Sequence, residues 1–228
     1  VHLGKPVQIL GGVLDYEIPD AVANGIILGI TDIETARKIS AESVKQGKTT
    51  ECHFKIDTGM GRLGILAKDA LEVIPEVLKL PNLNCCGIYS HFPVAYRGED
   101  DYSSKQLEKF YKILDCLWEK GIRLTKIHMA NSDGINNCPQ SYHYPFNYVR
   151  TGINLHGSFD NEGQRNLKLE SILTLKTRLV AVRTMPAGYS IYKLAEYDPK
   201  VHSAPNLWLE RREKPEAKYL AILVNDTG

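Results

Sequence analysis

Strand-like and helix-like segments alternate along this chain of 228 residues up to about residue 155. Short apolar runs predict six strands, over residues 7–10, 26–30, 51–57, 83–91, 124–130 and 148–150. Helices are expected between them, over residues 19–24, 32–47, 68–80 and 103–121, with a short one beginning at Asn131. Repeated strand–helix–strand units are right-handed and build a parallel sheet. The repeat therefore predicts an α/β fold whose strands all end at one edge of the sheet.

The pattern changes after about residue 157. Residues 167–184 contain alternating β-branched runs with no helix between them, which is typical of antiparallel strands. We therefore expect an α/β domain over residues 1–158 and a mostly β domain over residues 159–228. The sequence opens at a strand without an initiator methionine and closes just after another apolar run. We expect it to be part of a longer protein.

The composition argues against several classes of partner. A net charge of +1 provides no field that would recruit nucleic acid or a membrane surface. The apolar runs are too short to span a bilayer, and no signal peptide is visible. The five cysteines are odd in number and contain no CxxC pair, so neither a disulfide framework nor a metal site is expected. This cysteine usage fits a reducing, cytoplasmic location.

The stretch from His53 to Leu66 reads HFKIDTGMGRLGIL and joins a strand to a glycine-rich loop. Three glycines within six residues allow positive φ angles and let a ligand approach the backbone closely. Lys55 lies in the strand and Arg62 lies in the loop, and charges near a buried strand need a partner or a function. Two interpretations are open: a tight strand-to-helix turn with a salt bridge, and a ligand-binding loop.

Polar side chains also follow the other strands at the edge where those strands end. They are His91, Asn131, Ser132 and Arg150. In an eight-stranded barrel the reacting groups come from this edge, and a phosphate often binds to the loops after the last two strands. Ser132 and Gly152 lie in those loops, where a hydroxyl and a backbone N–H suit a phosphate dianion. Each residue alone has a commoner use: a helix cap for Ser132, a core histidine for His91 and an ion pair for Arg150.

Four motifs together resemble the alanine racemase family. They are KIDTGMGRLG over residues 55–64, SHF over residues 90–92, HMANSDG over residues 128–134 and VRTGINLHG over residues 149–157. The resemblance implies a TIM-type (β/α)8 barrel that binds pyridoxal 5′-phosphate (PLP), followed by a mostly β C-terminal domain. The six expected strands would be the third to the eighth of the barrel. The resemblance also implies a homodimer whose active site is shared between the subunits.

In this family resemblance, Arg150 would face the pyridine nitrogen of PLP, with His128 behind it. Arginine only donates hydrogen bonds, so it leaves the ring nitrogen without a proton and the ring a weaker electron sink. Transamination is then suppressed, and two bases exchange the substrate proton between the two faces. The other cofactor contacts that the resemblance implies are Leu10, Asn131, Ser132, Gly152 and Ile153.

The resemblance also implies roles near the substrate. Arg62 would bond the phenolic oxygen of PLP and help to hold the substrate carboxylate. Lys55 matches a lysine that is carbamylated in some members and then orients Arg62. His91 would orient the catalytic tyrosine of the partner subunit, and Tyr192 is the weak match to that tyrosine in this chain.

The chain departs from the family at the residue that holds the cofactor covalently. No segment matches the first-strand motif, similar to VKANAYGHG, that carries the Schiff-base lysine, and residues 193–228 match no later strand of the family. The chain by itself is therefore expected to be inactive. The leading prediction is an alanine racemase, an isomerase that supplies D-alanine for the peptidoglycan of the cell wall. The alternatives are a serine or broad-specificity racemase of the same fold and a catalytically silent PLP-binding module.

Overall fold

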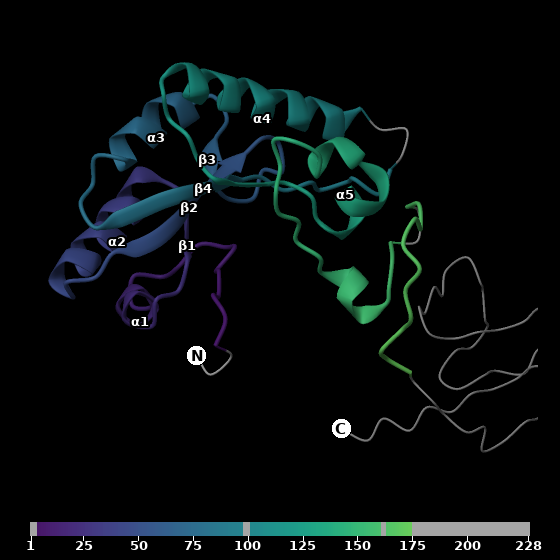
Figure 1. Ribbon diagram of the computed structural model, residues 1–228, viewed down its shortest axis with the longest axis horizontal. Coiled ribbons are helices and arrows are strands. Elements are labelled where there is room, and N and C mark those ends of the chain that lie inside the picture. Colours follow the sequence, from purple (N-terminus) through teal and green to yellow (C-terminus); the bar gives the residue numbers. More distant parts are fainter. Residues whose placement is uncertain (1–3, 98–100, 161–162, 175–228) are drawn as a thin grey trace, which may run out of the picture. The chain divides into compact units, whose positions relative to one another are not determined.

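The computed structural model describes residues 4–97, 101–160 and 163–174 (Figure 1). Every helix and strand in these residues lies within the compact unit Val1–Leu173. The strands are β1 (Leu28–Ile30), β2 (Thr50–Asp57), β3 (Ile65–Leu66), β4 (Leu83–Tyr89) and β5 (Lys126–His128). The helices are α1 (Ile18–Ala23), α2 (Ile33–Lys45), α3 (Ala70–Val77), α4 (Tyr102–Glu119) and α5 (Ser132–Asn137), with short 3-10 helices at Pro139–Ser141 and Ile153–His156.

The strands form a parallel sheet in the order β1-β2-β4-β5. Single parallel bridges at Gln8 and Tyr148 extend the sheet on its two sides. The six predicted strand positions therefore occur in the predicted order and direction. The strands predicted over residues 7–10 and 148–150 are wrong in length. In the described chain each segment forms only a single bridge, Gln8 with Ile27 and Tyr148 with His128. The two-residue strand β3, which pairs with β2, was not predicted.

The helices follow the strands as predicted, and local chemistry sets their ends. α2 begins after Asp32, whose side chain accepts a hydrogen bond from the Thr35 N–H (2.7 Å). α4 buries the predicted apolar face, which includes Leu107 and Phe110. α3 is shorter than the predicted range 68–80 and contains Pro75, which has no N–H to donate within the helix.

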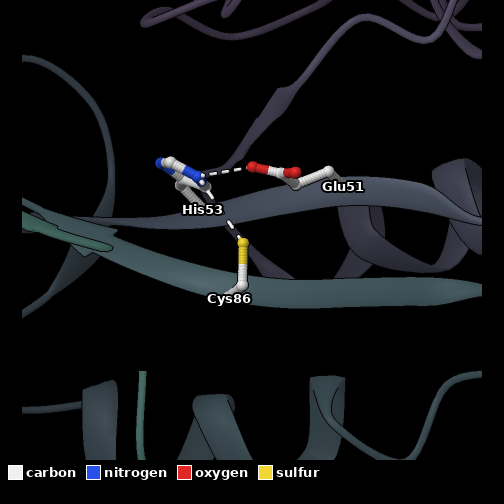
Figure 2. Close-up of side chains that lie close together, drawn as sticks. All are labelled: Glu51, His53 and Cys86. Carbon is white, nitrogen blue, oxygen red and sulfur yellow. Dashed lines mark hydrogen bonds and ion pairs between the residues drawn. The ribbon is translucent and has the colours of Figure 1, made fainter. Parts of the chain in front are cut away.

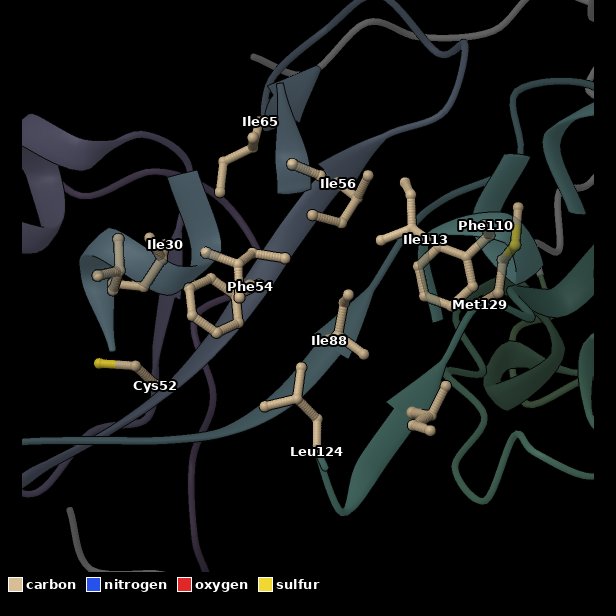
Figure 3. Packing of buried hydrophobic residues seen from close by; sticks show 14 of the residues in the cluster. Ile30, Cys52, Phe54, Ile56, Ile65, Ile88, Phe110, Ile113, Leu124 and Met129 are labelled. Carbon is tan, nitrogen blue, oxygen red and sulfur yellow. The ribbon is translucent and has the colours of Figure 1, made fainter. Parts of the chain in front are cut away.

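Successive residues of β2 point to opposite faces of the sheet. Cys52, Phe54 and Ile56 are at most 2% exposed and pack in the apolar core with helices α2, α3 and α4 (Figures 1 and 3). The opposite face, here called the inner face, carries polar and aromatic side chains. By strand register these are Glu51, His53, Lys55, Tyr89, Lys126 and His128.

The described residues after Gly157 contribute no strand to the sheet. Most of the predicted mostly β domain, residues 175–228, lies outside the described residues. The domain boundary at residue 158 and the second domain therefore stay predictions. Within the described part of the chain, no helix combines the length and the apolar character that crossing a membrane requires.

Candidate active site

Lys55 and Tyr89 meet the backbone of Leu10 on the inner face, near the carboxyl ends of β2 and β4. Lys55 Nζ donates to the Leu10 carbonyl oxygen (3.2 Å), and the Tyr89 hydroxyl donates to the same oxygen (2.9 Å). Two cations lie near the Tyr89 ring, with Lys55 Nζ 4.8 Å and Arg150 Cζ 5.3 Å from its centroid. Leu10 thus contributes its backbone carbonyl to this cluster, and its predicted place beside the cofactor stays a prediction.

Arg150 is held entirely by neutral acceptors. Its Nη1 lies 2.5 Å from His128 Nδ1, and its Nη2 donates to the carbonyl oxygens of Ser90 (2.6 Å) and Met129 (3.1 Å). His91 Nδ1 lies 3.4 Å from Nη2. Within the described residues Arg150 makes no salt bridge. The structure therefore brings His91, His128 and Arg150 together and excludes the ion-pair interpretation of Arg150 within the described chain.

Positive charge and burial shift the pKa values of this cluster in one direction. Burial, and then the charges of Arg150 and Arg62, lower the pKa of Lys55 to about 8. Burial and the charge of Arg150 lower the pKa of His91 to about 4, so this imidazole is neutral at pH 7. Burial lowers the pKa of Arg150 to about 10. The charges of Arg62 and Arg150 both contribute to the lowered pKa values of Lys55 and His91.

Arg62 lies on an exposed loop that is organised by Asp57. The Asp57 carboxylate accepts backbone N–H groups of Gly59 (2.8 Å), Gly61 (3.2 Å) and Arg62 (3.2 Å). Gly59, Gly61 and Gly64 all have positive φ, which explains the three glycines. Burial acts to raise the pKa of Asp57, but these backbone hydrogen bonds lower it overall. The loop is therefore closed by backbone donors instead of the salt bridge that one interpretation expected.

The loops after β5 and at residue 152 meet through Ser132. Ser132 Oγ accepts hydrogen bonds from the Gly152 N–H (2.8 Å) and the Asn154 N–H (3.4 Å). The cap of α5 is Asn131, whose Oδ1 accepts from the Gly134 N–H (2.8 Å), so Ser132 is not the plain helix cap of the alternative interpretation. Ser132 keeps its own hydroxyl hydrogen for another acceptor, beside the exposed residue Ile153.

Sequence reasoning missed four residues of the inner face, which are Glu51, His53, Tyr89 and Lys126. Tyr89 contacts both cations, and His53 lies against His128 (Nδ1 to Nε2, 3.1 Å). The signal was present in the alternation of β2, because His53 must share a face with Lys55. Tyr192, the weak match to the second catalytic base, lies outside the described residues.

Comparisons with known proteins match both the sequence and the fold. The sequence profile described as "Alanine racemase, N-terminal domain" matches residues 2–159. An alanine racemase of Methanococcus maripaludis is 33% identical over 201 residues, which cover 87% of this chain and 53% of that protein. An alanine racemase of Carboxydothermus hydrogenoformans is 37% identical over 197 residues, which cover 83% of this chain and 51% of that protein.

The solved structure of alanine racemase from Clostridium difficile 630 is similar with a TM-score of 0.69 and 30% identity. The similarity covers 75% of this chain and 46% of that chain. The chain therefore spans about half the length of the relatives it matches. The predicted resemblance and the predicted TIM-type barrel are confirmed, and the matched domain model ends before the predicted C-terminal domain.

Proposed function

The chain belongs to the alanine racemase family, and we propose that it forms the PLP-binding part of an enzyme that interconverts L-alanine and D-alanine. One observation carries the proposal: Lys55 and Arg150 both lie against the Tyr89 ring on the inner face, and neither makes a salt bridge within the described residues. Buried cations without counter-ions are unfavourable, so the site is suited to anions. A PLP phosphate, its phenolic oxygen and a substrate carboxylate are such anions.

Arg150 supports racemisation over other PLP chemistry. When bound, PLP withdraws electrons from the substrate and makes the proton on its α-carbon removable. Arg150 offers only N–H donors, and its contacts with Ser90, Met129 and His128 leave it cationic. It would face the pyridine nitrogen without giving it a proton, whereas a carboxylic acid would protonate it. This limits electron withdrawal by the ring and favours simple proton exchange.

The loops around Ser132 fit a phosphate. The Ser132 hydroxyl accepts from Gly152 and Asn154, so its hydrogen is free to donate to a phosphate oxygen. We assign phosphate binding to Ser132 and Ile153, with Asn131 beside the cofactor. The expected role of the Gly152 N–H at the phosphate changes, because this group donates to Ser132 Oγ and thereby orients the hydroxyl. The partial positive charge at the start of the 3-10 helix Ile153–His156 adds to this attraction.

Lys55 is suited to carbamylation. A pKa near 8 leaves a substantial neutral amine fraction at pH 7.5, and only the neutral amine reacts with CO2. The resulting anion would replace a cation that repels Arg62 and Arg150, and it would orient Arg62. In 13CO2-saturated buffer we expect a 13C carbamate resonance that is absent from Lys55→Arg and present in Lys48→Arg, which removes an exposed lysine. A resonance that survives Lys55→Arg would contradict this assignment.

The proposed function also includes roles for His91 and for a tyrosine of a partner subunit. His91 would orient a tyrosine of the partner subunit in a homodimer, and Tyr192 is the weak candidate for that tyrosine. The proposal also includes the mostly β C-terminal domain, a cytoplasmic location and the supply of D-alanine for peptidoglycan. The Schiff-base lysine motif has no match in these residues, so the chain by itself is expected to bind PLP without a covalent link.

Two measurements test the proposed function. PLP should bind the chain more tightly than pyridoxal, which lacks the phosphate, and Ser132→Ala should reduce that preference by ~2- to 10-fold, the effect of losing one hydrogen bond. In the protein that carries this chain, L-alanine should yield D-alanine in the presence of PLP. Faster formation of D-serine from L-serine would support the broad-specificity alternative. Bound PLP with no D-product would support the silent binding module, and absence of PLP binding would refute both.

A further inference from the structure

A row of buried polar side chains crosses the inner face beneath Arg150. Arg150 Nη1 lies 2.5 Å from His128 Nδ1, and His128 Nε2 lies 3.1 Å from His53 Nδ1. His53 Nε2 in turn lies 3.2 Å from Glu51 Oε1. His128 and His53 are 2% and 3% exposed, so neither exchanges these partners for water. The row connects the edge where the strands end to the opposite end of β2.

Arg150, the donor at one end of the row, determines which nitrogen of each histidine carries the proton. Arginine nitrogens only donate, so His128 Nδ1 must accept and the His128 proton lies on Nε2. His128 Nε2–H then donates to His53 Nδ1, which leaves the His53 proton on Nε2, where it donates to the Glu51 carboxylate. The Gln8 amide nitrogen also donates to His53 Nδ1 (3.0 Å), which agrees with an acceptor at that atom. All donors in the row therefore point from Arg150 toward Glu51.

We propose that Glu51 and His53 are positioning residues, because they complete a one-way hydrogen-bond chain that holds His128 in the Nε2–H tautomer and aims the Arg150 guanidinium at the cofactor. The chain is defined as Arg150–His128–His53–Glu51. The aim toward the cofactor rests on the proposed function, whereas the tautomers follow from the geometry alone. If either tautomer were reversed, two N–H groups would face one another at the Arg150 or the His128 contact.

Glu51 is suited to be the final acceptor of this chain. Lys126 forms an ion pair with its Oε1, and Lys126 lies beside it on the inner face. Burial acts to raise the pKa of Glu51, but hydrogen bonds from Lys126, Cys86 and His53 lower it overall. A carboxylate that is ionised and held by His53 and Lys126 gives the chain a fixed negative end opposite the positive end at Arg150.

Glu51, His53 and Cys86 lie close together (Figure 2), and a second interpretation of this cluster is a metal-binding site. Their donor atoms all lie within 4.8 Å of one another, and Cys86 Sγ is 3.9 Å from His53 Nε2. Ligation would need a lone pair on His53 Nε2, the atom that carries the proton in the chain. Moving that proton to Nδ1 would place it against the Nε2–H of His128. The donor order that Arg150 imposes therefore argues against a metal at this place.

Both histidines are expected to stay neutral. His128 faces Arg150, Lys55 and Lys126, and burial together with these charges lowers its pKa to about 2. Burial lowers the pKa of His53 against the opposing effect of Glu51. A neutral imidazole is required at each step, because a doubly protonated ring would break the one-way order.

Imidazole 15N resonances of the full chain test the tautomers without cofactor. At neutral pH we expect His53 and His128 each to show a protonated Nε2 and an unprotonated Nδ1, with no titration of His128 between pH 5 and pH 9. The exposed His143 is the internal control for the assignment of the imidazole resonances. A protonated Nδ1 on either buried ring, or a titration of His128 in this range, would overturn the chain as proposed.

Variants of Glu51 and Cys86 separate the chain from the metal interpretation. Glu51→Gln keeps an acceptor oxygen and should preserve both tautomers, whereas Glu51→Ala should change the His53 Nε2 resonance. Cys86→Ser is the matched control and should leave both histidines unchanged. Added Co2+ should give no thiolate-to-cobalt absorption. A stoichiometric band that disappears in Cys86→Ser would overturn the proposal, because it requires the lone pair on His53 Nε2.

PLP binding to the same variants tests the positioning role. Glu51→Ala should weaken PLP binding by ~2- to 10-fold and shift the absorption of bound PLP, because the acceptor of one hydrogen bond behind Arg150 is lost. An unchanged PLP spectrum together with altered histidine resonances would overturn the positioning role. If the unmodified chain binds no PLP while the tautomers are as expected, the proposed function fails and the hydrogen-bond chain stands.

Discussion

The two faces of β2 are buried to a similar degree and have opposite chemistry. Phe54 is 0% exposed on the face that packs against the helices, and Lys55 is 6% exposed on the inner face. Apolar contacts dominate the first face, where Thr50 at the start of β2 is hydrogen-bonded to Ser43. On the inner face most polar atoms have a specific hydrogen-bond partner. Burial therefore does not separate the core from the site. The two faces differ in whether their buried groups need hydrogen-bond or charge partners. On the inner face, Lys55 and Arg150 lack an anionic partner in the described chain.

The largest effect on stability is expected for a substitution on the face of the sheet that packs against the helices. Phe54→Ala removes a fully buried ring from the core shown in Figure 3 and should lower the free energy of unfolding by about 3–5 kcal/mol. Urea unfolding followed by circular dichroism would measure this. PLP affinity of the folded fraction should stay within about twofold, because Phe54 points away from the inner face. A loss below about 1 kcal/mol would contradict the assignment of this face as the core.

The second largest effect on stability is expected at Gly87, where the inner face is tightly packed. A Cβ at Gly87 would lie 2.3 Å from His53 Cγ, so Gly87→Ala must displace the His53 ring. The expected cost is about 1–3 kcal/mol, together with changed 15N resonances of His53. Gly11→Ala is the control, because its Cβ would meet nothing within 4 Å. Unchanged His53 resonances in Gly87→Ala would show that the ring does not occupy the place described.

Removing an unpaired inner cation should stabilise the chain. The folded pKa of Lys55 is about 8, below its ordinary value of 10.5, so between these values the unfolded state binds more protons. The stability of the unmodified chain should therefore rise as pH increases from about 8 to about 10.5. Lys55→Met should gain about 1–2 kcal/mol at pH 7, and the gain should fade across that range. Thermal unfolding at several pH values, without CO2, would measure both, and a loss of stability at pH 7 would contradict the prediction.

The smallest effect is expected for a charge pair that faces solvent. Lys79 Nζ lies 2.6 Å from Glu76 Oε1, and both side chains are more than half exposed. Lys79→Ala should change the free energy of unfolding by only about 0–0.5 kcal/mol. Urea unfolding in low salt would test this. An effect as large as that of Lys55→Met would mean that polar groups on the two sides of the sheet do not differ as described.

Much of the fold was predictable because hydrophobic periodicity is local. The apolar face of α4 and the parallel order of the strands both follow from residue spacing within short segments. The errors occurred where distant partners decide the outcome. The segments at Gln8 and Tyr148 pair through single bridges, and β3 exists only because Ile65 lies beside Ile56.

For the candidate site, too, local motifs were readable from the sequence, whereas contacts between distant residues were not. Sequence motifs identified Lys55, His91, His128 and Arg150, and the structure brings them into one cluster. Tyr89 and His53 were missed because their importance lies in contacts with residues of other strands. The salt-bridge interpretation of the glycine loop is wrong within the described residues, because the oxygens of Asp57 accept backbone N–H groups of the loop instead.

The sequence by itself determined the family, the alternation of strands and helices, and which residue types stand at the ends of the strands. It could do so because side-chain spacing and motif order are properties of a continuous chain. Only the tertiary structure decided which nitrogen atoms carry protons and which cations are left without anions. Those properties depend on distances between residues that the sheet brings together from different strands, as in the row from Arg150 to Glu51.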